Sequence, residues 1–291
     1  MKLSLLDIFA CPACGHQELA AGPSPLPRNG RLIDGELRCS SCSRAYPVRD
    51  GVPDFVMNGR RRPSPSQRLM EMAPITRIYE EQWRPQLVRA VSPGLTFDEE
   101  LRTVTRWLRL EPGDRLLDLA CGPGLYTRPL AKLVAGDGAK GATGDVIGVD
   151  ISGPMLKEAV KLAAADGIGN VIYIRADVQN LPFRKRAQFS HATCMAAFHL
   201  FPDPTAVTQA VGGLLKKGGA FCLLTTRTSR TPWIRAAERL SSRFSGLRFF
   251  DESELDGMFR ASGLVPGERK QYGPVVLMIE ARAQHARKPA A

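Results

Sequence analysis

Two cysteine pairs near the start of the chain constrain its folding more than any other feature. Cys11 and Cys14 form one Cys-x2-Cys pair, and Cys39 and Cys42 form a second pair, with 24 residues between the two pairs. Two tight turns of this kind bring four thiolates around one cation in a tetrahedron, the coordination that zinc prefers. Four cysteine ligands leave no position for water or substrate, so we predict a structural zinc site. His16, beside the first pair, is a weaker ligand candidate.

Composition bounds the class of protein. The 291 residues are 44% hydrophobic, enough for a catalytic domain and a small accessory module. The other three of the seven cysteines lie in apolar segments, which favours a metal site in a reducing compartment over disulfides, and we expect a cytoplasmic protein. We find no secretory signal and no apolar run of about 20 residues that would cross a membrane. The net charge of +11 favours RNA, a membrane surface or a phosphorylated substrate as partner, with a merely solvated basic surface as the alternative.

The chain divides into four segments by composition and periodicity. They are a cysteine-rich unit (1–57), a linker with cap helices (58–96), a main domain (97–282) and a basic, disordered tail (283–291). Proline, serine and arginine over Arg60–Ser66 indicate an exposed connector, and helical spacing follows it through Tyr79 and Trp83.

Strand-like and helical stretches alternate through the main domain, which predicts an α/β fold with a parallel sheet and helices on both of its faces. The expected strands are 115–120, 146–150, 171–175, 189–194 and 220–225, and the expected helices are 126–134, 154–165 and 205–215. After a helix at 252–261, residues 264–267 and 275–281 are predicted to pair as antiparallel strands. The ten residues from Gly136 to Asp145 form a glycine-rich insertion whose role the sequence does not reveal.

Acidic residues at the ends of three expected strands indicate a ligand site. Asp118 precedes Gly122 and Gly124, where the backbone can approach a ligand closely and a helix begins. A carboxylate at 118 suits the ammonium of a methionine moiety and would repel a pyrophosphate, and the third glycine of the dinucleotide fingerprint is missing. Asp150 is placed for ribose hydroxyls and Asp177 for an adenine amine.

These segments resemble two known families. The first is the small zinc-ribbon family that includes the activator subunit of tRNA and protein methyltransferases, on the motif Cys11-Pro-x-Cys14 with Cys39-x-x-Cys42-x-x-x-Tyr46-Pro47-Val48-x-Asp50-Gly51-Val52-Pro53. This resemblance implies a module that docks on a methyltransferase domain and stabilises it, here within one chain. The second is the class I methyltransferases, on Asp118-x-x-x-Gly122-x-Gly124, the strand end at Asp150, and Asp177 followed by Leu181-Pro182-Phe183. Within that class the chain is most similar to the ubiquinone and menaquinone biosynthesis branch.

The second resemblance implies a seven-stranded Rossmann-like methyltransferase sheet and S-adenosyl-L-methionine as cofactor beside the structural zinc. Carried over to this chain, the cofactor-binding residues are Asp118, Cys121, Gly122, Gly124, Asp150, Ile151, Met155, Asp177, Val178, Cys194 and Met195. Cys194 lies in an apolar strand, which favours a core or cofactor contact over a nucleophile. Ser190 stands where relatives often have an aspartate, a departure that bears on stability more than on chemistry.

Residues acting on the acceptor are harder to recognise. Methyl transfer needs an aligned nucleophile, and a base only where the acceptor loses a proton. His199 is the candidate base, with capping of the following helix as the competing interpretation. The Asn/Asp-Pro-Pro-aromatic motif of nucleobase amino methyltransferases is absent there. The arginine-rich segment 226–247 occupies a usual place for a substrate cap, although a solvated helix face would have the same composition.

We therefore expect methyl transfer by in-line displacement to a small organic acceptor. The alternative is an RNA methyltransferase whose zinc ribbon and arginines bind rRNA or tRNA. The sequence indicates no oligomeric state.

Overall fold

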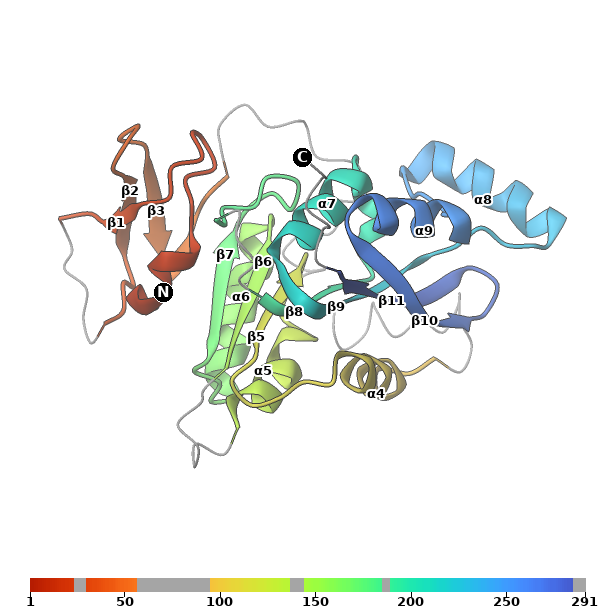
Figure 1. Ribbon diagram of the computed structural model, residues 1–291, viewed down its shortest axis with the longest axis horizontal. Coiled ribbons are helices and arrows are strands. Elements are labelled where there is room, and N and C mark those ends of the chain that lie inside the picture. The colour runs from red at the N-terminus through yellow and green to blue at the C-terminus, as the bar shows by residue number, and fades with distance from the viewer. Residues whose placement is uncertain (24–29, 57–94, 137–143, 185–188, 285–291) are drawn as a thin grey trace, which may run out of the picture. The chain divides into compact units, whose positions relative to one another are not determined.

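The computed structural model describes residues 1–23, 30–56, 95–136, 144–184 and 189–284 (Figure 1). The chain forms two compact units, one of Met1–Arg62 with Glu111–Gln188 and one of Pro63–Leu110 with Phe189–Ala291. The predicted connector Arg60–Ser66, the segments around Tyr79 and Trp83, most of the glycine-rich insertion and nearly all of the basic tail lie outside the described residues.

The first unit begins with the cysteine-rich segment, which folds as a four-stranded antiparallel meander. Its elements are the 3-10 helix η1 (Leu3–Ile8) and the strands β1 (Leu19–Ala21), β2 (Gly35–Cys39), β3 (Ala45–Arg49) and β4 (Val52–Pro53). Burial alternates along β3, where Tyr46 and Val48 are buried between exposed neighbours. This period of two is expected of a strand with one covered face.

The rest of the first unit contains three parallel strands connected by helices, as the alternating pattern predicts. Its elements are β5 (Arg115–Leu119), α5 (Thr127–Ala135), β6 (Asp145–Asp150), α6 (Gly153–Ala165) and β7 (Val171–Arg175). β6 lies between β5 and β7, so Ile147 pairs with both Leu117 and Ile172. The side chain of Ser152 caps α6 by accepting from the amide of Met155 at 3.3 Å. The strands thus end together at one edge, where a ligand site of this fold is expected.

The second unit contributes four strands in the order β10-β11-β9-β8. Its elements are α4 (Phe97–Leu108), β8 (Phe189–Met195), η3 (Phe198–Leu200), α7 (Pro204–Leu214), β9 (Leu215–Thr226), α8 (Pro232–Ser245), α9 (Glu252–Ala261), β10 (Leu264–Tyr272) and β11 (Val276–Ala283). β8 and β9 are parallel, and the predicted antiparallel pair at the end is confirmed as β10 and β11.

Two details of the second unit differ from the prediction. The strand expected at 220–225 starts earlier, because residues 215–219 already belong to β9, which begins directly after α7. β10 extends to Tyr272, beyond the predicted end at 267, and a register shift between Pro266 and Arg269 accommodates this length.

The first unit contributes the parallel strands β5 to β7 and the second the mixed strands β8 to β11, so the predicted α/β class and the strand number of seven are confirmed. The buried residues of both units are mainly aliphatic and aromatic. No helix within the described ranges is long and apolar enough to span a membrane.

Candidate active site and metal centre

The four cysteines of the two pairs come together at one point of the ribbon. Their sulfur atoms all lie within 4.8 Å of one another, with 3.7 Å between Cys11 and Cys42 and 3.7 Å between Cys14 and Cys39. A zinc ion with Zn–S bonds of about 2.3 Å spaces its ligands about 3.8 Å apart, whereas a disulfide needs about 2.05 Å. The four thiols therefore fit a tetrahedral zinc ion.

The backbone forms the same turn at both pairs. The amide of Gly15 donates to the carbonyl of Cys11 at 2.8 Å, and the amide of Ser43 donates to that of Cys39 at 3.0 Å. Gly15 and Ser43 both have positive φ, 76° and 57°. His16 lies outside the cluster, with its ring 3.8 Å from Glu18. The zinc site therefore needs only the four predicted cysteines.

The ribbon packs against the segment that follows β7 in the same unit. Phe9 stacks between Phe55 and Phe183, with 5.5 Å from its ring centroid to each. Backbone bonds support this stack, from the amide of Ala10 to Pro182 and from Arg184 to Ile8, both at 2.9 Å. The contact thus involves Pro182 and Phe183, two residues of the motif that follows Asp177.

Arg175, the last residue of β7, connects the ribbon to the predicted cofactor loop. Its Nη1 donates to a carboxylate oxygen of Asp54 at 2.6 Å, and its Nε donates to the carbonyl of Ile151 at 3.0 Å. The carbonyl of Arg175 also accepts from the amide of Phe55 at 2.8 Å. The ribbon and the residue after Asp150 are therefore held by one side chain. Sequence reasoning missed this role, because an ion pair 121 residues apart leaves no local pattern.

Asp150 links β6 to the glycine turn. One carboxylate oxygen accepts from the amide of Gly122 and the other from that of Ser152, both at 2.8 Å. The side chain is nearly buried, with 8% of its surface exposed. A carboxylate can accept about four hydrogen bonds, so these donors orient it and are compatible with further donors such as ribose hydroxyls. The geometry thus fits the predicted adenosine contact.

Asp118 has a supporting contact that the sequence did not indicate. It is 2% exposed, and one of its oxygens accepts from the hydroxyl of Thr127 at 2.6 Å. Thr127 is the first residue of α5, so Asp118 helps to fix the helix that follows the glycine turn. A contact of Asp118 with the methionine ammonium stays a prediction.

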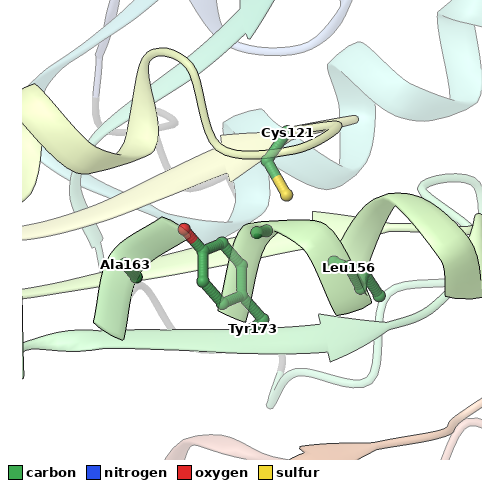
Figure 2. Packing of buried hydrophobic residues seen from close by; sticks show 5 residues of the cluster. Cys121, Leu156, Ala163 and Tyr173 are labelled. Carbon is green, nitrogen blue, oxygen red and sulfur yellow. The ribbon is translucent and has the colours of Figure 1, made fainter. Parts of the chain in front are cut away.

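Tyr173 of β7 supports the glycine turn from below. A Cβ at Gly124, where φ is +88°, would lie 2.5 Å from the hydroxyl of Tyr173, and one at Gly148 would lie 2.8 Å from its ring. Figure 2 shows Cys121 above this ring, in a cluster with Leu156 and Ala163 of α6. Glycine is thus required at both positions, and at 148 an isolated glycine inside a strand was the available signal.

The other residues predicted to contact the cofactor in the first unit surround this turn. Burial, with the nearby Asp150 and Asp118, raises the pKa of the Cys121 thiol, which keeps it neutral. Met155 and Val178 are buried. Asp177 lies in the loop that follows β7, where its carboxylate accepts from the amide of Gln179 at 3.0 Å. Their contacts with a bound cofactor remain predictions.

The second unit holds the remaining predicted residues at the end of β8. Cys194 is fully buried and Met195 nearly so, which agrees with a core or cofactor contact. Ala196 follows with φ at 61°, as Ala120 follows β5 with φ at 51°. Such conformations strain a residue other than glycine and concentrate at ligand sites. In each unit, therefore, a strained alanine follows a strand whose end carries predicted site residues.

His199 lies in η3, four residues after Met195. It does not cap α7, because Asp203 does so by accepting from the amide of Ala206 at 3.0 Å. Its Nδ1 is buried and has no hydrogen-bond partner within the described ranges. Burial lowers the pKa of His199 to about 4, so the ring is neutral at pH 7.

This burial predicts a pH dependence of stability. Because the pKa of His199 is lower in the folded state than its ordinary value of 6.5, the unfolded state binds more protons as the pH falls from 6.5 to 4. The free energy of unfolding should therefore decrease over that window. At 1.36 kcal/mol per pH unit, this group should lower the free energy of unfolding of the unchanged protein by about 2 kcal/mol between pH 7 and pH 5. Replacing His199 by asparagine should remove that part of the decrease. Urea unfolding at both pH values measures it, and an equal loss in both proteins would contradict the burial of this ring.

Comparison with known proteins finds a family match for the cysteine-rich segment and another for the main domain. Residues 116–219 match the family model of a methyltransferase domain, and residues 2–51 match that of Trm112p-like proteins. An uncharacterized chloroplastic methyltransferase of Arabidopsis thaliana is 29% identical over 251 residues, covering 80% of this chain and 66% of its own. A ubiquinone biosynthesis O-methyltransferase of Paraburkholderia phymatum is 31% identical over 173 residues, covering 56% of this chain and 70% of its own. The chain belongs to the class I S-adenosylmethionine-dependent methyltransferases.

The fold agrees with this assignment. The crystal structure of the YcgJ protein from Bacillus subtilis covers 65% of this chain and all of its own, with a TM-score of 0.55 at 19% identity. The predictions of a methyltransferase, of S-adenosylmethionine as its methyl donor and of a zinc ribbon are thus confirmed. The RNA alternative finds no support in these relatives, of which one is named for ubiquinone biosynthesis.

Proposed function

We propose that this methyltransferase methylates a hydroxyl group of a small, quinone-type aromatic acceptor. The observation that carries this proposal is the 31% identity to a ubiquinone biosynthesis O-methyltransferase, of which the chain covers 70%. The absence of the nucleobase motif after β8, where Ala196 to His199 stand, also supports a small acceptor. A cytoplasmic location stays a prediction, since one relative is chloroplastic.

The cofactor supplies an electrophilic methyl group, and the chain supplies its alignment. In this proposal Asp150 accepts from the ribose hydroxyls, and Asp118, Gly122 and Gly124 hold the methionine end. Met155, Asp177 and Val178 surround the adenine, Ile151 and Cys121 line the loops between these groups, and Cys194 and Met195 line the methionine side. The bonds from Gly122 and Ser152 to Asp150 support the first assignment, because they orient its carboxylate before a ligand arrives.

His199 is the proposed base for the proton of the acceptor hydroxyl. Its neutral ring is the form that accepts a proton. A base with a pKa of about 4 is weak toward a phenol, whose pKa is about 10. We therefore assign most of the rate to alignment of the reactants and only a small share to proton transfer.

The zinc ribbon is proposed to stabilise the cofactor half of the enzyme from within the same chain. The phenylalanine stack at Phe9 and the link through Arg175 support this role. The functional segments in this proposal are the ribbon (1–57), the linker with cap helices (58–96), the catalytic domain (97–282) and the tail (283–291).

Methyl transfer with a labelled donor tests the acceptor class. The zinc-loaded protein is incubated with S-adenosylmethionine carrying a labelled methyl group and with either hydroxylated benzoquinone and naphthoquinone precursors or total tRNA and rRNA. Label in a quinone-type product whose mass increases by one methyl group is expected, and the Asp150→Ala variant should abolish it. Label in RNA, or in no ring compound, would contradict the proposal.

A further inference from the structure

Helix α8 exposes two large apolar side chains to solvent, and we propose that it docks the protein on an anionic lipid bilayer. Trp233 is 73% exposed and Leu240 is 61% exposed. They are seven residues apart, about two helical turns, so both side chains lie on one face of α8. Ala236 and Ala237 are also exposed between them. The other large exposed hydrophobics of the described ranges are isolated, Leu133 on α5 and Ile33 in the ribbon.

The opposite side of α8 carries a buried acidic residue. Glu238 is buried, and its carboxylate accepts from the amide of Ser229 in the preceding loop at 2.9 Å. Of the large hydrophobic side chains of α8 whose burial the structure describes, Ile234 is half-buried on this side, while Trp233 and Leu240 are exposed. An ordinary surface helix turns its largest apolar side chains toward the core, whereas α8 (light blue in Figure 1) leaves Trp233 and Leu240 exposed.

Positive charge accompanies the apolar face. Arg235, Arg239 and Arg243 are exposed on the same helix, and in the described ranges none of them forms an ion pair. The acidic side chain of α8, Glu238, points inward to Ser229. A helix with tryptophan and leucine on one face and arginines beside them lies in the interface of a bilayer, and anionic headgroups attract each arginine. The charge thus favours an anionic lipid surface over an apolar protein surface.

RNA would also attract the arginines, but it gives no reason for an exposed leucine and alanines, since nucleic acids bind aromatic and basic side chains. A second copy of this chain would bring its own arginines to the contact, where like charges repel. A bilayer accommodates both features. This inference does not depend on the acceptor, although a surface-bound enzyme would meet apolar acceptors where they concentrate.

Co-sedimentation with lipid vesicles tests the proposal without any methyl transfer. The zinc-loaded protein is mixed with vesicles of phosphatidylcholine alone or of phosphatidylcholine and phosphatidylglycerol. Binding is expected only to the anionic vesicles. Replacing Trp233 and Leu240 by serine should lower it at least about tenfold, and replacing the three arginines by glutamine should lower it on the order of 100-fold. The Leu133→Ser and Ile33→Ser variants remove comparable side chains elsewhere and should bind as the unchanged protein does.

Tryptophan emission shows whether α8 itself meets the lipid. The difference in emission between the protein and its Trp233→Phe variant should shift to shorter wavelengths when anionic vesicles are added. A difference spectrum already shifted without vesicles would show that another part of the chain, or a second copy, covers this face, and would overturn the proposal. So would binding that survives both α8 variants, absence of binding to anionic vesicles, or binding to RNA with none to lipid. All variants should retain affinity for S-adenosylhomocysteine, which shows that they are folded.

Discussion

Removing the zinc ion, or replacing Cys11 and Cys14 by serine, will unfold residues 1 to about 57. Metal binding contributes on the order of 10 kcal/mol to the folding of a module this small. Without zinc, the four thiols, which are spaced for a zinc tetrahedron, lack the ion that holds them together. Circular dichroism and zinc release measured with a colorimetric chelator follow this loss directly.

The loss of the ribbon will also weaken cofactor binding. Phe183 loses the ring of Phe9 that stacks on it, and Arg175 loses Asp54. We expect the melting temperature of the whole protein to fall by about 5 °C or more and the affinity for S-adenosylhomocysteine to fall at least about tenfold. Calorimetry on the protein before and after chelation measures both. Unchanged affinity after complete zinc loss would mean that the ribbon binds the substrate and does not stabilise the cofactor half of the enzyme.

A local variant separates the effect of the Arg175 contacts from the effect of zinc loss. Replacing Arg175 by glutamine leaves the zinc site intact but removes the bonds to Asp54 and to the carbonyl of Ile151. We expect a loss of affinity of only a few-fold, because a partly exposed ion pair is worth about 1 kcal/mol or less. Lys2→Gln is the matched control. It breaks another ion pair of the ribbon, with Asp145 at the start of β6, far along the strand from Asp150, and should leave affinity unchanged.

Replacing Asp150 by alanine will abolish most of the affinity for S-adenosylmethionine. The variant lacks the acceptors proposed for two ribose hydroxyls and releases the amides of Gly122 and Ser152. Hydrogen bonds to a charged group contribute about 1.5 to 3 kcal/mol each, so two of them correspond to a loss on the order of 100-fold or more. Isothermal titration with S-adenosylhomocysteine measures it.

Two controls make the Asp150 experiment specific. Asp145→Asn removes a carboxylate from the other end of β6 and should retain affinity. NAD should produce no heat with the unchanged protein, because its pyrophosphate would face Asp118. If NAD bound, or if Asp150→Ala bound S-adenosylhomocysteine as tightly as before, our account of the cofactor site would be wrong.

The sequence by itself determined the elements whose signals are local. Helix and strand ends were predicted mostly within one or two residues, since apolar periodicity and the glycine turn act over a few residues. The four cysteines were equally readable, because metal geometry dictates their spacing within each turn. The predicted end of β10 and the predicted start of β9 were wrong, because pairing with a neighbouring strand decides where a strand begins and ends.

Only the tertiary structure revealed what those elements do to one another. The bond from Arg175 to Asp54 and the stack of Phe9 on Phe183 join positions 121 and 174 residues apart, and neither partner is unusual in its own segment. Tyr173 under Gly124 and the outward turn of Trp233 on α8 are likewise matters of packing. Periodicity tells which residues share a face of a helix, but only the surrounding chain decides whether that face is covered. For this protein, local sequence therefore specified the glycine turn and the two cysteine pairs, while long-range contacts decided how the ribbon packs against the segment after β7.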